Sequence, residues 1–374
     1  MLITGANAFD GKAFRPDLMI QLEQGILTAV DKHLQPLPGE QILDLAGDFL
    51  LPGFVDVHIH GFRRHDTMQG EAALRAMSRD LAAVGVAAFC PTTMSASPED
   101  TRAALQGIRA VMDRPEARGA RVLGAHMEAP FLQESRAGAQ RKEFFQDPDW
   151  TALEWMTGGH PEIVRLITLA PERAGAEAFI RKAVRHGIHV SLGHTSASAA
   201  LTHAAAGWGA DHITHTFNAQ TALHHREPGV PGAALSDDRF FCEMICDGVH
   251  LHRDIIRMMV RCKSAARAVA VTDAMEAAGM PEGEYVLGGQ KVFVRGGEAR
   301  LADGTLAGSV LTMAQALHNL IHLFGISPAE ACTLCTSSPA DSLSLPLAGR
   351  MLPGAPGLLT RWSPSWEMVS VLQG

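Results

Sequence analysis

The chain has 374 residues, a formal net charge of −8 and an isoelectric point near 6.1. It contains no basic cluster and no interleaving of basic and aromatic residues, so neither nucleic acid nor an anionic membrane is an expected partner. No apolar run reaches the length that spans a bilayer, and the first residues lack a secretion signature, so we expect a cytoplasmic enzyme.

The first 48 residues read as short strands broken by Gly, Pro and Asp, a pattern that predicts a small sheet domain. The expected strands cover residues 1–4, 17–23, 25–30 and 41–44. The Pro- and Gly-rich tail after residue 345 has strand-like ends, and we assign it to the same sheet. Residues 1–50 and 345–374 are therefore predicted to form one small, discontinuous β-sandwich domain.

From residue 54 onward, apolar strand-like runs alternate with helical patterns. Eight such runs are expected, at residues 54–60, 86–93, 121–128, 164–170, 188–194, 212–216, 241–247 and 268–273. Helices are expected at residues 71–84, 98–112, 172–186, 197–206 and 254–262. Because eight strands each followed by a helix-sized interval are typical of a (β/α)₈ barrel, residues 51–344 are predicted to form a TIM-like barrel.

The first of these runs ends in His58-Ile-His60. Side chains two residues apart on a strand point to the same face, so His58 and His60 are predicted to point the same way. The carboxyl end of a barrel strand is where such a fold carries its chemistry. One His-x-His pair is a weak signal in a chain with 18 histidines, so its meaning depends on the later strands.

Four later runs also end in a side chain that can bind a metal: Glu128, His194, His215 and Asp273. A buried carboxylate or imidazole costs several kcal/mol unless it is paired or bound to metal, so convergence on one centre is the economical explanation. Histidine and carboxylate ligands suit Zn²⁺ or Fe²⁺, and the absence of cysteine argues against a closed structural zinc site. The sequence predicts an open, hydrolytic metal centre.

Several motifs together resemble the N-acetylglucosamine-6-phosphate deacetylase family of the amidohydrolase superfamily, in order along nearly the whole chain. They are Pro52-Gly-Phe-Val-Asp-Val-His-Ile-His-Gly61, His126-Met-Glu-Ala-Pro-Phe131, Gly193-His-Thr195, Thr214-His-Thr-Phe-Asn-Ala219, His225-Arg-Glu-Pro-Gly229, Asp247-Gly-Val-His250, Val271-Thr-Asp-Ala-Met275 and Gly304-Thr-Leu-Ala-Gly-Ser309. The His-x-Glu-x-Pro-Phe and Arg-Glu-Pro-Gly segments are the most specific of these.

This resemblance implies that Glu128, His194 and His215 hold the principal divalent ion and that Asp273 is the general acid/base. His58 and His60 match a second, more solvent-facing metal position that some members of the family lack. One or two ions per subunit are therefore expected, with Zn²⁺ favoured over Fe²⁺ or another divalent ion.

The implied substrate is a phosphorylated N-acetyl amino sugar. The resemblance places Asn218, Ala219 (through its backbone) and His250 at the sugar phosphate, and Leu306 beside the acetyl group. It also implies a homodimer in which His225 and Arg226 reach the phosphate from the neighbouring subunit. A planar guanidinium is well matched to a phosphate.

Two positions depart from the family pattern. Ala129 stands where glycine is usual, which predicts a slightly altered loop beside Glu128. Gln140 stands where a number of members have a histidine that contacts the substrate carbonyl. Gln140 can donate through its amide but cannot donate a charge-assisted bond, so the preferred acyl sugar is left open.

Three alternatives are weighed against a deacetylase of N-acetylglucosamine 6-phosphate. N-acetylgalactosamine 6-phosphate as the substrate fits the same residues. A cyclic-amide or N-acyl-amino-acid hydrolase would keep the metal ligands but has no use for the His225-Arg226-Glu-Pro-Gly segment. A non-catalytic assembly protein would be expected to have lost ligands, and the chain retains all of them.

Overall fold

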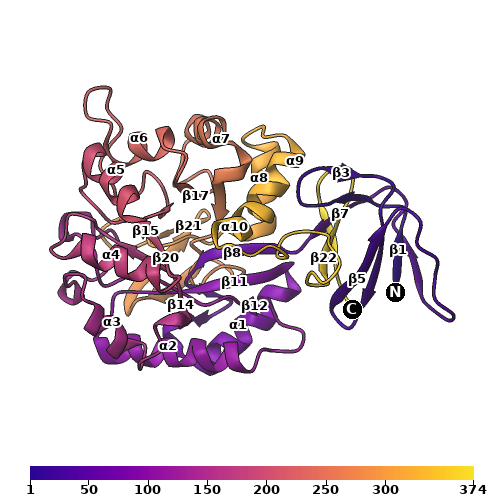
Figure 1. The fold of residues 1–374 in the computed structure, drawn as a ribbon, viewed down its shortest axis with the longest axis horizontal. Helices are drawn as coiled ribbons and strands as arrows, with labels where there is room; N and C mark the ends of the chain where they lie inside the picture. The colour runs from indigo at the N-terminus through magenta and orange to yellow at the C-terminus, as the bar shows by residue number, and fades with distance from the viewer.

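Eight parallel strand positions curl into a barrel in the computed structural model, which describes residues 1–374 (Figure 1). The barrel strands are β8 (Phe54–Ile59), β11 (Val86–Thr93), β12 (Arg121–Val122) with β13 (Ala125–Met127), β14 (Val164–Leu169), β15 (His189–Leu192), β16 (His212–Ile213), β17 (Phe241–Ile245) and β18 (Ala268–Val271). A parallel bridge between Ile59 and Ala274 connects the first strand to the end of the last one. The predicted TIM-like barrel is confirmed.

The central barrel strands are mostly apolar and buried because both of their faces are covered. All eight residues of β11 and all six of β8 are buried. Parallel strands lined by side chains within and packed against helices outside lose the alternation seen in half-exposed sheets. The main hydrophobic core therefore lies between the strands and the surrounding helices.

Ten α-helices accompany the strands: α1 (Glu71–Ala83), α2 (Pro98–Asp113), α3 (Trp150–Met156), α4 (Ala176–Arg185), α5 (Ala199–Trp208), α6 (Gly229–Ser236), α7 (Arg253–Arg267), α8 (Met313–His322), α9 (Pro328–Cys335) and α10 (Ser337–Ser342). Short 3₁₀ turns cover Thr67–Gln69, Glu134–Arg136, Lys142–Phe144 and Pro161–Ile163. Several starts are set by a capping hydroxyl: Ser97 accepts from the Asp100 backbone N–H, and Thr312 accepts from that of Gln315. The short helices α3, α6 and α10 were not expected from the sequence.

Both chain ends contribute to the small domain, which lies at the right of Figure 1. Its four-stranded sheet contains β1 (Leu2–Thr4), β4 (Met19–Glu23), β5 (Ile26–Asp31) and β6 (Ile42–Asp44). Its five-stranded sheet contains β2 (Asn7–Phe9), β3 (Phe14–Arg15), β7 (Phe49–Pro52), β22 (Leu358–Trp362) and β23 (Met368–Gln373). β7 crosses the expected boundary at residue 50 and pairs with β22, so this sheet extends to Pro52.

An inserted hairpin sheet follows the last barrel strand. It contains β19 (Gly283–Leu287), β20 (Gln290–Arg295) and β21 (Glu298–Arg300), and a smaller ribbon of β9 (Gly61–Phe62) and β10 (His65–Asp66) follows the first strand. Leu287 and Val292 of the hairpin sheet share an apolar cluster with Met94 and Met275, which follow barrel strands. The hairpin sheet is thereby fixed over the carboxyl end of the barrel. No helix is long and apolar enough to cross a membrane.

Candidate metal centre and active site

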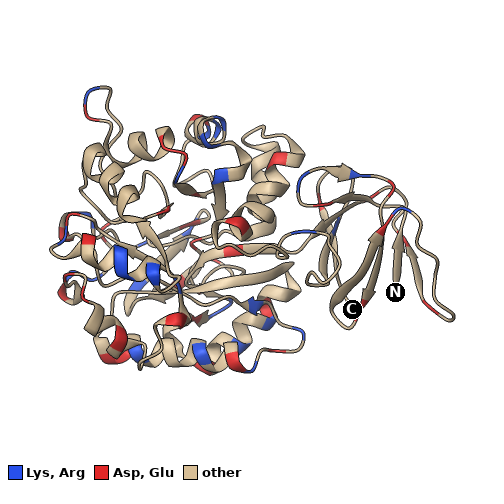
Figure 2. Ribbon diagram, in the orientation of Figure 1, with Lys and Arg blue, Asp and Glu red and all other residues tan.

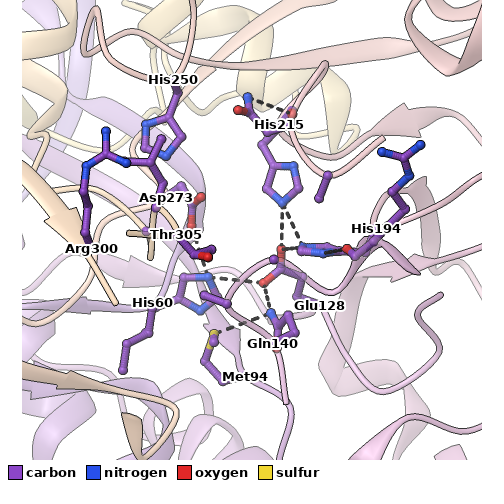
Figure 3. Close-up of a pocket in the computed structure, with 18 of the residues that line it drawn as sticks. His60, Met94, Glu128, Gln140, His194, His215, His250, Asp273, Arg300 and Thr305 are labelled. Atoms are coloured by element: carbon purple, nitrogen blue, oxygen red, sulfur yellow. Dashed lines mark hydrogen bonds and ion pairs between the residues drawn. The ribbon is translucent and has the colours of Figure 1, made fainter. Parts of the chain in front are cut away.

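His194, His215 and Asp273 each lie just beyond the end of a barrel strand, where the backbone turns sharply. Their φ angles are +46°, +26° and +48°, in the left-handed region that residues other than glycine rarely adopt. Such a conformation costs about 1–3 kcal/mol per residue and is characteristic of functional sites. The turn redirects each side chain from the strand end toward the barrel axis, where Figure 3 shows them converging.

The first cluster joins Glu128, His194 and His215. Glu128 Oε1 lies 3.1 Å from His194 Nε2 and 3.1 Å from His215 Nε2, and the two nitrogens are 3.1 Å from each other. All three side chains are buried. These atoms are arranged as three ligands around one point.

A second cluster shares the same carboxylate. His60 Nε2 lies 3.3 Å from Glu128 Oε2 and 3.1 Å from Asp273 Oδ1, and His58 Nε2 lies 3.4 Å from the same Asp273 oxygen. Glu128 therefore presents one oxygen to each cluster (Figure 3). Two groups of possible metal ligands thus lie next to each other and meet at one carboxylate.

The proton positions of the imidazoles indicate whether a cation fits there. In three rings Nδ1 faces a fixed acceptor: Arg136 O at 2.8 Å from His194, Thr92 O at 3.2 Å from His60, and a Glu243 carboxylate oxygen at 2.9 Å from His58. Nδ1 must donate in each case, so the Nε2 atom of the neutral ring carries a lone pair. Those lone pairs point at carboxylate oxygens, which are also acceptors. A divalent cation resolves this conflict and matches the donor types.

The pKa shifts of the cluster residues also indicate that positive charge is favoured at this site. Burial lowers the pKa of His58, but the charges of Asp273, Glu243 and Glu128 outweigh it and raise that pKa to about 9. Burial also lowers the pKa of His60. Hydrogen bonds to Asp273 and Glu128 and the charges of these carboxylates outweigh burial and raise that pKa well above its usual value. The imidazoles in turn hold the pKa of Glu128 well below its usual range despite its burial.

A cavity of about 460 Å³ opens over these clusters. Most of the side chains expected at the site line it: His60, Glu128, Gln140, His194, His215, Asn218, Ala219, His250, Asp273 and Leu306. His58 lies beneath the cavity and is fully buried. A cavity of this size suits a small-molecule substrate.

His250 and Asn218 line the cavity and are each held by a hydrogen bond. His250 Nδ1 donates to Asp247 at 2.6 Å, which leaves Nε2 as the atom free to meet a ligand. Burial raises the pKa of Asp247, but hydrogen bonding and the nearby charge of His250 bring it below its usual value. The Asn218 amide nitrogen lies 3.4 Å from the His215 carbonyl oxygen, which ties this side chain to the loop of a cluster residue.

Gln140 lines the cavity and also contacts Glu128. Its amide nitrogen donates to Glu128 Oε2 at 2.6 Å, and its amide oxygen accepts from the Ser95 backbone N–H at 2.7 Å. The side chain is thus fixed at both ends. In this position Gln140 orients the shared carboxylate as well as lining the cavity (Figure 3).

His225 and Arg226 do not line the cavity of their own chain. Both are exposed, and an Arg226 guanidinium nitrogen lies 2.8 Å from His225 Nε2. The loop that carries them precedes α6 and projects from the barrel at the upper left of Figure 1, and Figure 2 shows residues of both charges at its tip. These two side chains are therefore presented outward.

The side chains of the second cluster are no more exposed than those of the first. His58 and His60 expose only 0% and 2% of their surface, against 5% each for His194 and His215. For His58 the reason is its position along the strand. His58 lies within β8 itself, whereas His194 and His215 follow the ends of β15 and β16.

Sequence reasoning missed several residues of the site, of which three carry polar groups of interest. Glu243 lies in the middle of β17 and accepts a hydrogen bond from His58. A carboxylate inside an apolar run could have indicated a buried functional group. Arg300 and Thr305 line the cavity from the hairpin sheet and the segment after it. Nothing in the local sequence distinguishes those two from ordinary surface residues.

Comparison with known proteins agrees with this geometry. A model of the amidohydrolase family matches residues 49–371. The N-acetylglucosamine-6-phosphate deacetylase of Bacillus subtilis (strain 168) is 37% identical over 87% of this chain and 83% of its own length. The N-acetylgalactosamine-6-phosphate deacetylase of Escherichia coli O157:H7 is 35% identical over 90% of this chain and 88% of its own length.

A solved structure gives the same result. The N-acetyl-D-glucosamine-6-phosphate deacetylase of Mycobacterium smegmatis, in complex with N-acetyl-D-glucosamine-6-phosphate, superimposes with a TM-score of 0.91 at 31% identity. The match covers all of this chain and 97% of the other. The motifs, the barrel with its paired clusters and these matches have one explanation: the chain belongs to the metal-dependent amidohydrolase family, in its N-acetylglucosamine-6-phosphate deacetylase branch.

Proposed function

We propose that this protein hydrolyses the acetamide of N-acetyl-D-glucosamine 6-phosphate to D-glucosamine 6-phosphate and acetate. Water supplies the oxygen of acetate, the amide C–N bond breaks, and the nitrogen leaves as the amine after gaining a proton. This reaction belongs to amino-sugar catabolism and to the recycling of cell-wall sugars.

The observation that carries the proposal is the pair of clusters sharing Glu128 at the floor of the cavity. We assign the principal divalent ion, with Zn²⁺ favoured, to Glu128, His194 and His215, and a second ion to His58 and His60. A divalent ion held there polarises the amide carbonyl and lowers the pKa of water from about 15.7 toward about 7.

Asp273 is the proposed carrier of the proton. Its carboxylate, 3.1 Å from His60 Nε2, faces the same cavity as Glu128. We infer that it accepts the proton of the attacking water and then delivers it to the leaving nitrogen. We infer that the hydrogen bond from Gln140 holds the Glu128 carboxylate in place, so that Glu128 does not turn toward the substrate.

The other cavity residues are assigned to the sugar and its acyl group. Asn218 and the Ala219 backbone offer N–H donors for the phosphate, His250 Nε2 can donate to it only from the doubly protonated ring, and Leu306 offers an apolar contact for the acetyl methyl. Because His250 Nδ1 is held by Asp247, the free Nε2 is directed to the cavity. The cavity thus offers both polar and apolar contacts, as an acetylated sugar phosphate requires.

Turnover on matched substrates tests the proposal. We expect the protein to release acetate from N-acetylglucosamine 6-phosphate far faster than from unphosphorylated N-acetylglucosamine, and metal analysis to find one or two divalent ions per chain. Equal rates of acetate release from the phosphorylated and the unphosphorylated sugar would contradict the substrate assignment. Release of other carboxylic acids from N-acyl amino acids would favour a different amidohydrolase activity.

N-acetylgalactosamine 6-phosphate is a second candidate substrate, and the 35% identity to the Escherichia coli N-acetylgalactosamine-6-phosphate deacetylase favours it specifically. The two sugars differ only in the orientation of one hydroxyl. The ratio of the kcat/KM values measured side by side for the two 6-phosphates decides between them.

Arg226 is proposed to bind the 6-phosphate. Replacing Arg226 by Ala removes a charge-assisted contact of about 1.5–3 kcal/mol, so kcat/KM for the phosphorylated sugar is expected to fall by about 10- to 150-fold. The unphosphorylated sugar should be unaffected, because it offers no partner to the guanidinium. Steady-state kinetics on both substrates measures the difference.

An arginine far from the cavity provides the control. Arg79 lies on α1 and forms an ion pair only with Glu116, so Arg79→Ala should leave kcat/KM unchanged for both substrates. Equal losses on the two substrates in the Arg226 variant would show that Arg226 supports the loop or the reacting centre rather than the phosphate.

We further propose that the protein is a homodimer in which His225 and Arg226 complete the partner's site. The support is that both side chains are exposed on a projecting loop and absent from the wall of their own cavity. Asp273→Asn and Arg226→Ala chains, each nearly inactive at low substrate concentration, should therefore complement when refolded together. With random pairing, half of the dimers are mixed and half of their sites are intact, so activity should recover to roughly a quarter of wild type.

Mass measurement of the refolded sample establishes whether mixed dimers formed. If they are present and activity does not recover, Arg226 acts on its own subunit or outside the site, and the proposed contribution across the interface is wrong.

A further inference from the structure

Glu243 is a fully buried carboxylate at the centre of β17, beneath the cavity floor. One of its oxygens, Oε2, accepts two hydrogen bonds. His58 Nδ1 donates at 2.9 Å, and the backbone N–H of His215 donates at 2.9 Å. A single oxygen atom therefore contacts one residue from each of the two ligand clusters.

The contact with His58 determines which ring nitrogen can bind a cation. Because a carboxylate can only accept, Nδ1 of His58 carries the proton and Nε2 carries the lone pair. That Nε2 atom has no hydrogen-bond partner and lies 3.4 Å from Asp273 Oδ1. A carboxylate behind a ligating imidazole fixes the orientation of the ring and raises its basicity as a ligand.

The contact with His215 acts on the backbone. His215 has a φ of +26°, a conformation that surrounding interactions must maintain. Its N–H is held by Glu243 rather than by a neighbouring strand. Glu243 thus stabilises the turn that directs the His215 ring to Glu128.

The charge of Glu243 points to the same role. Its only ion-pair partner is His58, and its second oxygen, Oε1, has no partner at all. An isolated carboxylate buried in a protein is costly unless positive charge lies nearby. A cation held by His58 Nε2 would provide that charge through the same ring.

We propose that Glu243 is a positioning residue that sets both halves of the metal centre and is required for the second ion. The inference rests on the proposed metal centre and assigns no contact between Glu243 and substrate. The second position depends on Glu243 more strongly than the first, because His58 is held through its ring whereas His215 is held only through its backbone.

Metal titration of the full-length protein tests this inference. Metal-free wild type, Glu243→Gln and Glu243→Ala are titrated with Zn²⁺ against a competing chelator, and elemental analysis gives the number of ions per chain. For wild type we expect two ions. For Glu243→Ala we expect the affinity of the second position to fall by about 10- to 100-fold, so that one ion remains under limiting metal.

Glu243→Gln separates geometry from charge. Its amide oxygen can occupy the Oε2 position and keep both hydrogen bonds, but it is a weaker acceptor than a carboxylate. We therefore expect a smaller loss of second-ion affinity than in the Ala variant, with the first ion retained. This isosteric variant also serves if the Ala variant does not fold.

Ser191→Ala is the matched control. Ser191 is equally buried in the barrel interior, and its hydroxyl contacts Thr214 at 2.6 Å without touching a ligand. It should bind both ions like wild type. Unchanged second-ion affinity in the folded Glu243 variants, or a single ion in wild type, would overturn the inference about Glu243. A wild-type protein that binds no ion would instead overturn the proposed metal centre itself.

Discussion

Replacing Asp273 by Asn is expected to lower kcat by about 10²- to 10⁴-fold while leaving KM nearly unchanged. Burial raises the pKa of the Asp273 carboxyl, but His58 and His60 outweigh it and hold that pKa at about 2. The carboxylate is therefore ionised at neutral pH and ready to accept a proton from water. An amide has the same size and cannot carry a proton, so the variant isolates this role.

Metal content must be measured in the same variant, because Asp273 also lies beside the second cluster. Retention of the ion at Glu128, His194 and His215 together with a low kcat would assign the loss to proton transfer. Asp254→Asn, a change at an exposed carboxylate in α7, should have no effect. If Asp273→Asn keeps wild-type kcat across neutral pH, Asp273 is not the proton carrier.

Replacing His194 by Ala is expected to remove the principal ion and to lower kcat by at least about 10²- to 10³-fold, the cost of losing one electrostatic stabiliser of the transition state. His194 Nδ1 is held by the Arg136 carbonyl at 2.8 Å, so Nε2 is fixed toward Glu128 and no neighbouring side chain replaces it. Elemental analysis and acetate release are measured on the same preparation.

Chelation of the wild-type protein should have the same result, and adding a divalent ion should restore activity. The His194 variant should not respond to moderate metal concentrations. His318→Ala, a change at a partly exposed histidine that contacts Glu367 on the surface, is the control and should keep both metal and activity. Full activity in thoroughly chelated wild-type protein would contradict a metal-dependent reaction.

Part of the small domain escaped sequence reasoning for a clear reason. β2, β3 and β7 contain only three, two and four residues. A strand this short completes at most two alternations, so its own residues carry almost no periodic signal. These strands exist because β7 can pair with β22 from the other end of the chain, a contact that no local pattern encodes.

Glu243 illustrates the same limit within the site. A carboxylate in the apolar run of β17 indicated an unusual buried group, but not its partner. Whether its side chain meets His58 depends on which strand face turns inward and on the register between neighbouring strands. Both are decided only when the barrel closes, since His58 and Glu243 are 185 residues apart in the sequence.

The sequence by itself determined the barrel and most of the residues around its cavity. Uninterrupted apolar runs separated by helical patterns specify parallel strands, and the carboxyl ends of parallel strands meet at one end of a barrel. Ligand-type side chains at five of those ends, as at His60, Glu128 and His215, were therefore enough to predict their convergence. The tertiary structure alone decided that Glu128 serves two clusters, that His58 and His60 are the more buried pair, and that Arg226 points outward. Those features depend on distances between segments far apart in the chain, which are fixed by packing and closure rather than by any local pattern.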